Sequence, residues 1–356
     1  MEKWLSDDSR VLFEALVPSF TGPSRLDRMV GLAELMQGKG LLADAARLSR
    51  KVLAESRGQS LASQRARRLL GANIPDWHYS ILQDQVRLEA YERAIRATVT
   101  PGSLVLDIGT GSGILAMMAA RAGAGLVVAC ERDPAVAQVA TKIVARNNLS
   151  DRIRIVACAS SALRVGGELP RRAEVVISEL FSATLLGESV LPTMAQARRE
   201  LLTADAPAVP RRATIHVALV RAEKRFHKPV GMVAGFDLLD FNVLGPPFHV
   251  CGHASPEALL SDAAELFSLD LTGCDPVSDA RASVELRVSR AGAAVGVLQW
   301  WEGELSEGVI LSTAPGAPST SWGQCFTPFD ESLPVVAGQT VTVHGWHSSD
   351  QLAVWV

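Results

Sequence analysis

Short apolar runs alternate with amphipathic ones between residues 104 and 177, and a glycine-rich turn follows the first run. Runs of this kind are typical of buried parallel strands joined by helices that cover both faces of a sheet. We therefore predict an α/β, doubly wound, Rossmann-like core. We expect strands over 104–107, 126–130, 153–157 and 175–177, and helices over 114–122 and 134–147.

The glycine-rich turn indicates the class of ligand. Gly109, Gly111 and Gly113 have the spacing Gly-x-Gly-x-Gly, whereas a dinucleotide loop has Gly-x-Gly-x-x-Gly. Asp107 precedes them at the carboxyl edge of the sheet, where it can accept hydrogen bonds. Glu131 ends the next strand, where an acidic side chain would bind ribose hydroxyls. Together these features favour S-adenosylmethionine over a nicotinamide dinucleotide as the cofactor.

Two carboxylates lie close in sequence just after the last strand of this core. Glu179 and Glu188 are the acidic residues of the segment 178–188, which we expect to form a hairpin. Two carboxylates can hold a planar guanidinium in one orientation by charge-assisted hydrogen bonds. A protonated guanidinium has no nucleophilic lone pair. We therefore expect catalysis to come from alignment and from drawing positive charge away from the attacking nitrogen.

The pattern changes to strict alternation after Pro210, which predicts an antiparallel sheet or barrel. Between its first two strands lies a long insertion, about 226–266, with an Ala- and Leu-rich helix expected near 256–267. An insertion of that size in a compact barrel is usually functional. We expect barrel strands over 213–220, 283–288, 295–305, 324–329, 339–344 and 352–356.

The first 71 residues have a helical pattern, with a break at Gly38-Lys39-Gly40 between two helices. One interpretation is a single tetratricopeptide-like unit, and the other is a helical cap on the next domain. A single repeat cannot bury its own face, and no second copy is visible in the sequence. We therefore favour the cap.

Composition restricts the class of protein further. The 356 residues are 48% hydrophobic with a formal net charge of −3, so no global attraction to nucleic acid is expected. Five scattered cysteines without a Cys-x-x-Cys pair argue for a reducing compartment and against a metal site. The chain starts without a targeting signal and has no run long enough to span a membrane. We expect a soluble, cytoplasmic protein.

Several segments together resemble the protein arginine N-methyltransferases. Residues 81–87 followed by Tyr91 are similar to the N-terminal signature of the family, and 105–113 to its cofactor loop. Residues 178–188 resemble its double-glutamate loop, and Thr320-Ser321-Trp322 stands where the family has Thr-His-Trp. Finer details resemble the monomethylating branch and the branch with tetratricopeptide repeats. The resemblance covers about residues 76–356.

The helical pattern gives an N-terminal region over 1–75, and the resemblance implies an S-adenosylmethionine-binding domain over 76–212 and a barrel domain for substrate over 213–356. It also implies roles for single residues. Arg87 would pair with the carboxylate of the cofactor, and Ser160 stands near the adenine at a position that is often acidic in the family. Glu179 and Glu188 would flank the guanidinium.

In the barrel, the resemblance implies that Trp322 walls the arginine pocket by stacking, since aromatic faces attract guanidinium ions. Ser321 departs from the family, because serine loses the imidazole and its possible pairing with an acid. His78, His344 and His347 are further candidates, but a lone histidine is more often structural, so we assign them no catalysis.

The insertion over 226–266 corresponds to the dimerisation arm of the family, which implies a homodimer; the competing view is a monomer whose insertion folds on its own barrel. We expect methyl transfer to a guanidino nitrogen of arginine, either in a protein or peptide or as free L-arginine. The alternative is a binding or scaffold protein that retains an inactive core.

Overall fold

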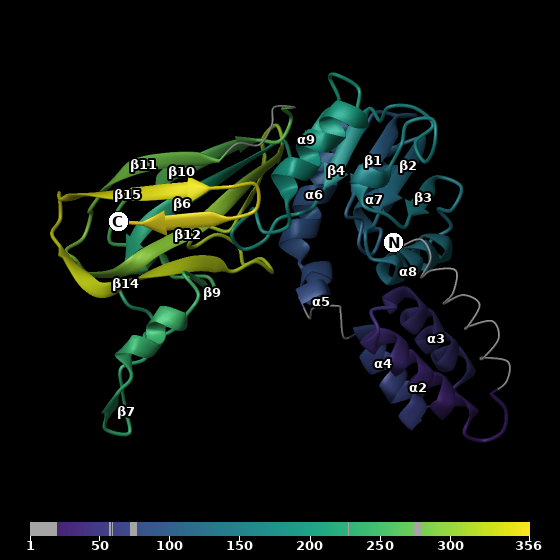
Figure 1. Ribbon diagram of the computed structural model, residues 1–356. Coiled ribbons are helices and arrows are strands. Elements are labelled where there is room, and N and C mark those ends of the chain that lie inside the picture. The colour runs from purple at the N-terminus through teal and green to yellow at the C-terminus, as the bar shows by residue number, and fades with distance from the viewer. Residues whose placement is uncertain (1–19, 57, 59, 72–76, 227, 274–278) are drawn as a thin grey trace.

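The computed structural model describes residues 20–56, 58, 60–71, 77–226, 228–273 and 279–356. The start of the chain and Cys274, both used above, lie outside these ranges. The chain forms an N-terminal helical unit, an α/β domain and a β-barrel domain, with the α/β domain between the other two (Figure 1). Within the described residues no helix is both long and apolar enough to cross a membrane.

The described part of the N-terminal unit has three helices, and the predicted break separates α2 (Arg25–Gly38) from α3 (Leu42–Glu55). These two helices form an antiparallel pair, and α4 (Leu61–Gly71) packs on both. They bury a small core of their own that includes Met29, Leu48 and Val52. In Figure 1 the unit lies beside α8, which α3 contacts.

A five-stranded parallel sheet forms the centre of the α/β domain, in the order β3-β2-β1-β4-β5. Strand β1 is buried at every position, as its continuous apolar sequence predicts. The strands are β1 (Leu104–Ile108), β2 (Leu126–Cys130), β3 (Ile153–Val156), β4 (Val175–Ser178) and β5 (Ala208–Val209). The helices are α5 (Trp77–Gln83), α6 (Gln85–Thr98), α7 (Ile114–Ala122), α8 (Pro134–Arg146) and α9 (Val190–Glu200), with the 3-10 turn η2 (Ser160–Ala162).

The strand order reverses direction at β1. From β1 the chain moves outward through β2 and β3, then returns to the other side of β1 for β4 and β5. In sheets of this kind ligands bind beyond the carboxyl ends of the strands at such a reversal. The loops after β1 and β4 therefore flank the expected binding crevice.

The barrel domain consists of antiparallel sheets. One has the order β10-β6-β12-β14-β9 with β13 added on β12, and a second has β11-β15-β16. The long central strand β12 pairs with both β6 and β14. The strands are β6 (Arg212–Val220), β9 (His249–Cys251), β10 (Ala264–Asp270), β11 (Ala280–Arg287), β12 (Gly292–Ser306), β13 (Val309–Ser312), β14 (Gln324–Val335), β15 (Thr340–His347) and β16 (Leu352–Trp355).

The insertion contains a separate projection. The short strands β7 (Met232–Val233) and β8 (Phe236–Asp237) form a hairpin that is followed by the 3-10 turn η3 (Leu239–Leu244). We call residues 230–244 the arm, which extends away from the barrel in Figure 1. Its large apolar side chains are exposed, including Phe236 at 71% and Val243 at 85%.

The helix predicted near 256–267 is wrong. Only Pro256–Ala258 form a 3-10 turn (η4), and the residues from Ala264 form the edge strand β10. Its pairing with β6 includes Phe267 opposite Ile215, and both side chains are buried. Alanine and leucine are good helix formers, but intrinsic propensity is small compared with packing, so cross-strand packing of this apolar face outweighs the local preference.

Candidate active site

The carboxyl ends of the central strands bring the predicted site residues together. Ile108 at the end of β1 is in register with Cys130 of β2 on one side and with Ser178 of β4 on the other. The glycine loop, Glu131 and Glu179 begin immediately after these three residues. They therefore lie along one edge of the sheet, although they are up to 70 positions apart in sequence.

The glycine loop has the backbone conformation that its sequence predicts. Gly109, Gly111 and Gly113 have φ angles of 73°, 54° and 85°, a region that other L-residues rarely adopt. A Cβ atom on Gly109 would lie 2.8 Å from Cδ2 of Leu180. The cofactor loop therefore touches the segment that carries Glu179, and only glycine leaves room for the contact.

Asp107 is fully buried at the start of this loop and accepts a hydrogen bond from Oγ1 of Thr110 at 2.5 Å. Burial raises the pKa of Asp107 to about 7, because an ionised carboxylate is poorly solvated there. The hydrogen bond from Thr110 acts in the opposite direction and favours the charged form. Burial and the hydrogen bond from Thr110 thus hold the Asp107 side chain in one position at the start of the glycine loop.

Glu131 joins the glycine loop to the turn before α8. One carboxylate oxygen accepts from the backbone N–H of Gly111 at 3.1 Å, and the other accepts from that of Asp133 at 2.8 Å. Each carboxylate oxygen can accept a second hydrogen bond. Glu131 is half-buried, so it remains able to accept from the hydroxyls of a ribose. Ser160 is buried in η2, beyond the end of the neighbouring strand β3.

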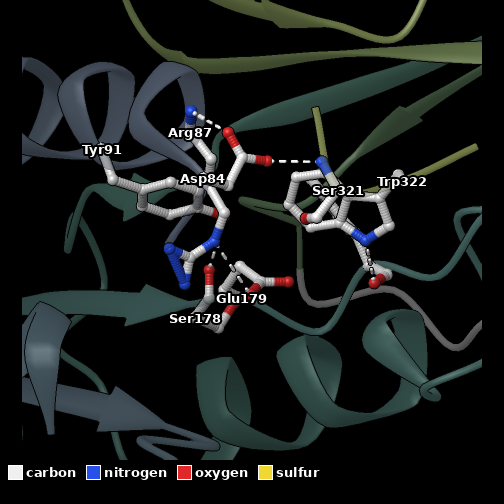
Figure 2. Close-up of polar contacts among 8 residues, drawn as sticks. Asp84, Arg87, Tyr91, Ser178, Glu179, Ser321 and Trp322 are labelled. Carbon is white, nitrogen blue, oxygen red and sulfur yellow. Dashed lines mark hydrogen bonds and ion pairs between the residues drawn. The ribbon is translucent and has the colours of Figure 1, made fainter. Parts of the chain in front are cut away.

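Arg87 projects from α6 into the same crevice, where only 4% of its side chain is exposed. Its Nε donates to Oε2 of Glu179 at 3.3 Å, and its guanidinium lies 5.8 Å from the centre of the Tyr91 ring (Figure 2). The sequence suggested only a cofactor carboxylate as its partner. The structure adds Glu179, a residue 92 positions away.

Glu179 is a buried carboxyl group in a mixed electrostatic environment. Burial raises its pKa to about 7, although the adjacent Arg87 favours the ionised form. The charge of Glu188 raises this pKa further, so the two acids are close enough to interact. Glu188 itself is exposed, and no hydrogen bond or ion pair to its carboxylate occurs within the described part of the chain.

We call residues 178–188 the glutamate loop. A tight turn closes it, with the N–H of Leu185 donating to the carbonyl of Ser182 at 2.9 Å. Leu185 is fully buried with a φ of 72°, and Ser189 after the loop has a φ of 58°. Positive φ angles at non-glycine residues store strain and persist where the surrounding structure enforces them. In place of the hairpin expected over 178–188, the structure has a single-bridge turn over 182–185, which is held under constraint.

The barrel contributes the segment 320–322 to this crevice. The backbone N–H of Ser321 donates to Oδ2 of Asp84 at 2.6 Å, while the other oxygen of Asp84 accepts from the N–H of Arg87 at 3.0 Å (Figure 2). Nε1 of Trp322 donates to the carbonyl of Phe181 at 2.9 Å. The hydroxyl of Ser321 is buried and has no hydrogen-bond partner among the described residues, so the segment is held to Asp84 through its backbone.

Three contributors were not identified from the sequence as site residues. Asp84 is the N-cap of α6, and an aspartate three residues before Arg87 is a capping signal that could have been read. The hydroxyl of Tyr91 donates to the carbonyl of Ser178 at 3.1 Å. Nε1 of Trp301 donates to the carbonyl of Ser182 at 3.0 Å. These last two hydrogen bonds join segments that are distant in the sequence, so no local sequence pattern predicts them.

Of the histidines considered from the sequence, His344 and His347 are not part of this group. Nδ1 of His344 pairs with Oγ of Ser283 at 2.7 Å, and Nδ1 of His347 lies 3.0 Å from the carbonyl of Ser348. Both belong to β15 of the three-stranded sheet, which agrees with a structural role. The side chain of His78 lies outside the described residues.

The crevice fits S-adenosylmethionine. Nη1 of Arg87 and Oγ of Ser112 are buried without a hydrogen-bond partner in the described chain. A free guanidinium nitrogen suits the carboxylate of the methionine portion, and the glycine loop allows close backbone approach. Glu131 is available for the ribose. The fold and this crevice therefore define a Rossmann-like, S-adenosylmethionine-dependent methyltransferase.

Comparisons with known proteins identify the family. Residues 211–350 match the arginine methyltransferase oligomerization subdomain, and residues 85–197 match ribosomal protein L11 methyltransferase. An arginine N(omega)-methyltransferase of Streptomyces achromogenes is 32% identical over 93% of this chain and 91% of its own length. The chain belongs to the protein arginine N-methyltransferase family, and it catalyses S-adenosylmethionine-dependent arginine methylation.

Other relatives match over a smaller part. Mouse protein arginine N-methyltransferase 7 is 34% identical over 77% of this chain, but the chain spans only 44% of that protein. Among solved structures, the Trypanosoma brucei PRMT1 enzyme-prozyme heterotetrameric complex with AdoHcy has a TM-score of 0.69 at 27% identity, covering 76% of this chain and 87% of that one. Arabidopsis thaliana protein arginine methyltransferase 10, at 22% identity and a TM-score of 0.64 over 75% of this chain and 86% of its own, shares the fold.

Proposed function

We propose that the acceptor of the methyl group is free L-arginine. The observation that carries this proposal is the match along almost the whole chain to a relative named for arginine rather than for protein arginine. That match leaves about 7% of this chain uncovered, so it must extend into the N-terminal helices. The mouse relative named for protein arginine covers less of this chain and continues far beyond it.

In the proposed reaction the cofactor supplies a sulfonium methyl group, and the residues of this chain position the acceptor. Glu179 and Glu188 hold the guanidinium between them and draw its positive charge away from the attacking nitrogen. Arg87 binds the carboxylate of the cofactor and, through Nε, orients Glu179. Glu131 and Ser160 bind the adenosine portion. Trp322 lines the arginine pocket, and Ser321 adds a hydroxyl that can donate a hydrogen bond.

The acceptor is tested by incubating the protein with labelled S-adenosylmethionine and either free L-arginine or an arginine-containing peptide. We expect label in free arginine, with Glu188→Gln as the inactive control. Label in the peptide alone would replace free arginine with peptidyl arginine, the acceptor that the family member named for protein arginine suggests. Transfer to neither compound would support a binding or scaffold role instead.

We further propose that the chain forms a homodimer through the arm and acts in the cytoplasm. The family match covers an oligomerization subdomain, and the arm exposes a continuous set of large apolar side chains that the monomer leaves uncovered. Contiguous apolar surface on a soluble protein usually marks an interface. The four cysteines that the structure describes are free, which suits a reducing compartment.

A further inference from the structure

Two tryptophans of the barrel bond to consecutive carbonyls of the glutamate loop. Nε1 of Trp322 donates to the carbonyl of Phe181 at 2.9 Å, and Nε1 of Trp301 donates to that of Ser182 at 3.0 Å. The indoles come from different segments: Trp301 from the central strand β12, and Trp322 from the loop before β14. Both are almost fully buried, with 1% and 7% exposed. The barrel therefore fixes the backbone of the loop.

Aromatic packing holds these side chains in the same arrangement as the hydrogen bonds. The ring of Phe181 meets Trp301 edge-on at 5.0 Å between centroids, and Trp301 meets Trp322 edge-on at the same distance. Gly303 lies two residues further along β12, and a Cβ there would approach Cε2 of Phe181 to 3.2 Å. We call Trp301, Gly303 and Trp322 the indole seat, on which Phe181 rests.

The two glutamates depend on this seat to different degrees. Glu179 has the side-chain contact to Arg87 that holds it in place. Glu188 has no comparable bond from any described residue, so the position of its carboxylate follows from the backbone of the loop. That backbone is strained at Leu185 and would relax if its external contacts were lost.

We infer that Trp301 is a positioning residue for methyl transfer, which holds the glutamate loop so that Glu188 faces the guanidinium. The inference rests on the arginine methylation stated above and holds for either acceptor. The carbonyl of Ser182 also accepts from the N–H of Leu185, so losing the indole donor leaves this carbonyl partly satisfied. Removal of the indole N–H should therefore loosen the loop without unfolding the chain.

Trp300 provides a matched control. It precedes Trp301 on β12, so its side chain points to the opposite face of the strand. There it stacks on His216 at 5.8 Å and belongs to a separate cluster that contains Phe226 and Phe326. It is equally bulky and 5% exposed, and it packs in a different cluster from Phe181 and the glutamate loop. Its substitution shows how much loop exchange and kcat change when a buried tryptophan of this strand is altered on the other face.

The experiment compares Trp301→Phe, Trp300→Phe and the unaltered protein. With S-adenosylhomocysteine bound, we expect faster backbone amide exchange over residues 180–187 in Trp301→Phe only. We also expect its kcat to fall by about tenfold to a hundredfold, since small misplacements of a reacting group have effects of that size. Any change in the Kd for S-adenosylhomocysteine should be smaller than the change in kcat, because Trp301 bonds to Ser182 and reaches the cofactor loop only through the contact of Leu180 with Gly109.

Gly303→Ala tests the same seat without removing a hydrogen bond, because its methyl group would displace Phe181. We expect the same combination of faster loop exchange and lower kcat. Amide exchange requires no acceptor, so a failure of the proposed acceptor is distinguishable from a failure of this inference. Unchanged loop exchange in both Trp301→Phe and Gly303→Ala would overturn the inference. Equal effects of Trp300→Phe and Trp301→Phe would also overturn it.

Discussion

Glu179 and Glu188 carry the same chemical group in different surroundings, and this difference gives them separate duties. Glu179 is buried beside Arg87, whereas Glu188 is exposed at the other end of the loop. The buried acid is oriented before the acceptor arrives. We propose that the exposed acid completes the grip on the guanidinium, so that the reaction requires its charge.

Glu188→Gln should therefore lower kcat by at least about a hundredfold, because an amide cannot hold positive charge away from the attacking nitrogen. Glutamine has nearly the same shape, so the loop should keep its fold. The Kd for S-adenosylmethionine, measured by calorimetry, should stay within about twofold of the unaltered value. A variant that retains kcat would refute the two-carboxylate mechanism.

The raised pKa of Glu179 predicts a pH dependence. With a pKa of about 7, Glu179 is increasingly protonated as the pH falls below 7, and the neutral acid cannot pair with a guanidinium. At saturating cofactor, kcat/KM for the acceptor should therefore rise about tenfold per pH unit up to about pH 7 and then level off. A profile that is flat between pH 5.5 and 7.5 would show that Glu179 is already ionised throughout that range.

At the scale of elements, the cofactor loop and the glutamate loop interlock. Gly109 and Leu180 are in van der Waals contact, with no room for a methyl group on the glycine. A change in the conformation of one loop should therefore alter the conformation of the other. We therefore expect this contact to couple the binding of cofactor to the placement of the glutamates.

Gly109→Ala should weaken S-adenosylmethionine binding and lower kcat, because its Cβ collides with Leu180 and its φ of 73° is unfavourable for alanine. Leu180→Ala removes the colliding group but leaves the φ strain. The double variant should therefore recover part of kcat, and a double-mutant cycle measures the coupling. Strictly additive effects of the two substitutions would mean that the loops act independently.

The elements nearest the site were the easiest to predict from sequence. The structure confirms α7 and β2 with the expected bounds, since continuous apolar runs between glycines leave few alternatives. The edge strand β10 was mistaken for a helix, because its partner β6 is about 50 residues away. The ion pair of Arg87 with Glu179 and the hydrogen bond from Trp301 could not be predicted from the sequence either. Periodicity shows which face of an element is buried, but not which residues of different elements come into contact.

At the scale of the whole molecule, the site is shared by two domains. The α/β domain carries the glutamate loop and the barrel fixes it, while the N–H of Ser321 bonds to Asp84 at the start of α6. Neither domain alone contains the complete arrangement. The N-terminal helices lie on the cofactor side, where α3 contacts α8.

The arm provides the test of assembly. Phe236 and Val243 are 71% and 85% exposed, so an aspartate at either position should reduce the folding stability of the isolated monomer only slightly. In a dimer formed through the arm, the same charge would be buried against apolar surface. Phe236→Asp combined with Val243→Asp should therefore shift the molar mass from dimer to monomer in sedimentation equilibrium.

Val336→Asp is the matched control, because Val336 is 63% exposed outside the arm and should leave the dimer intact. A double variant that sediments as a dimer would place the interface on another surface, and an unaltered protein that sediments as a monomer would show that the arm serves its own chain.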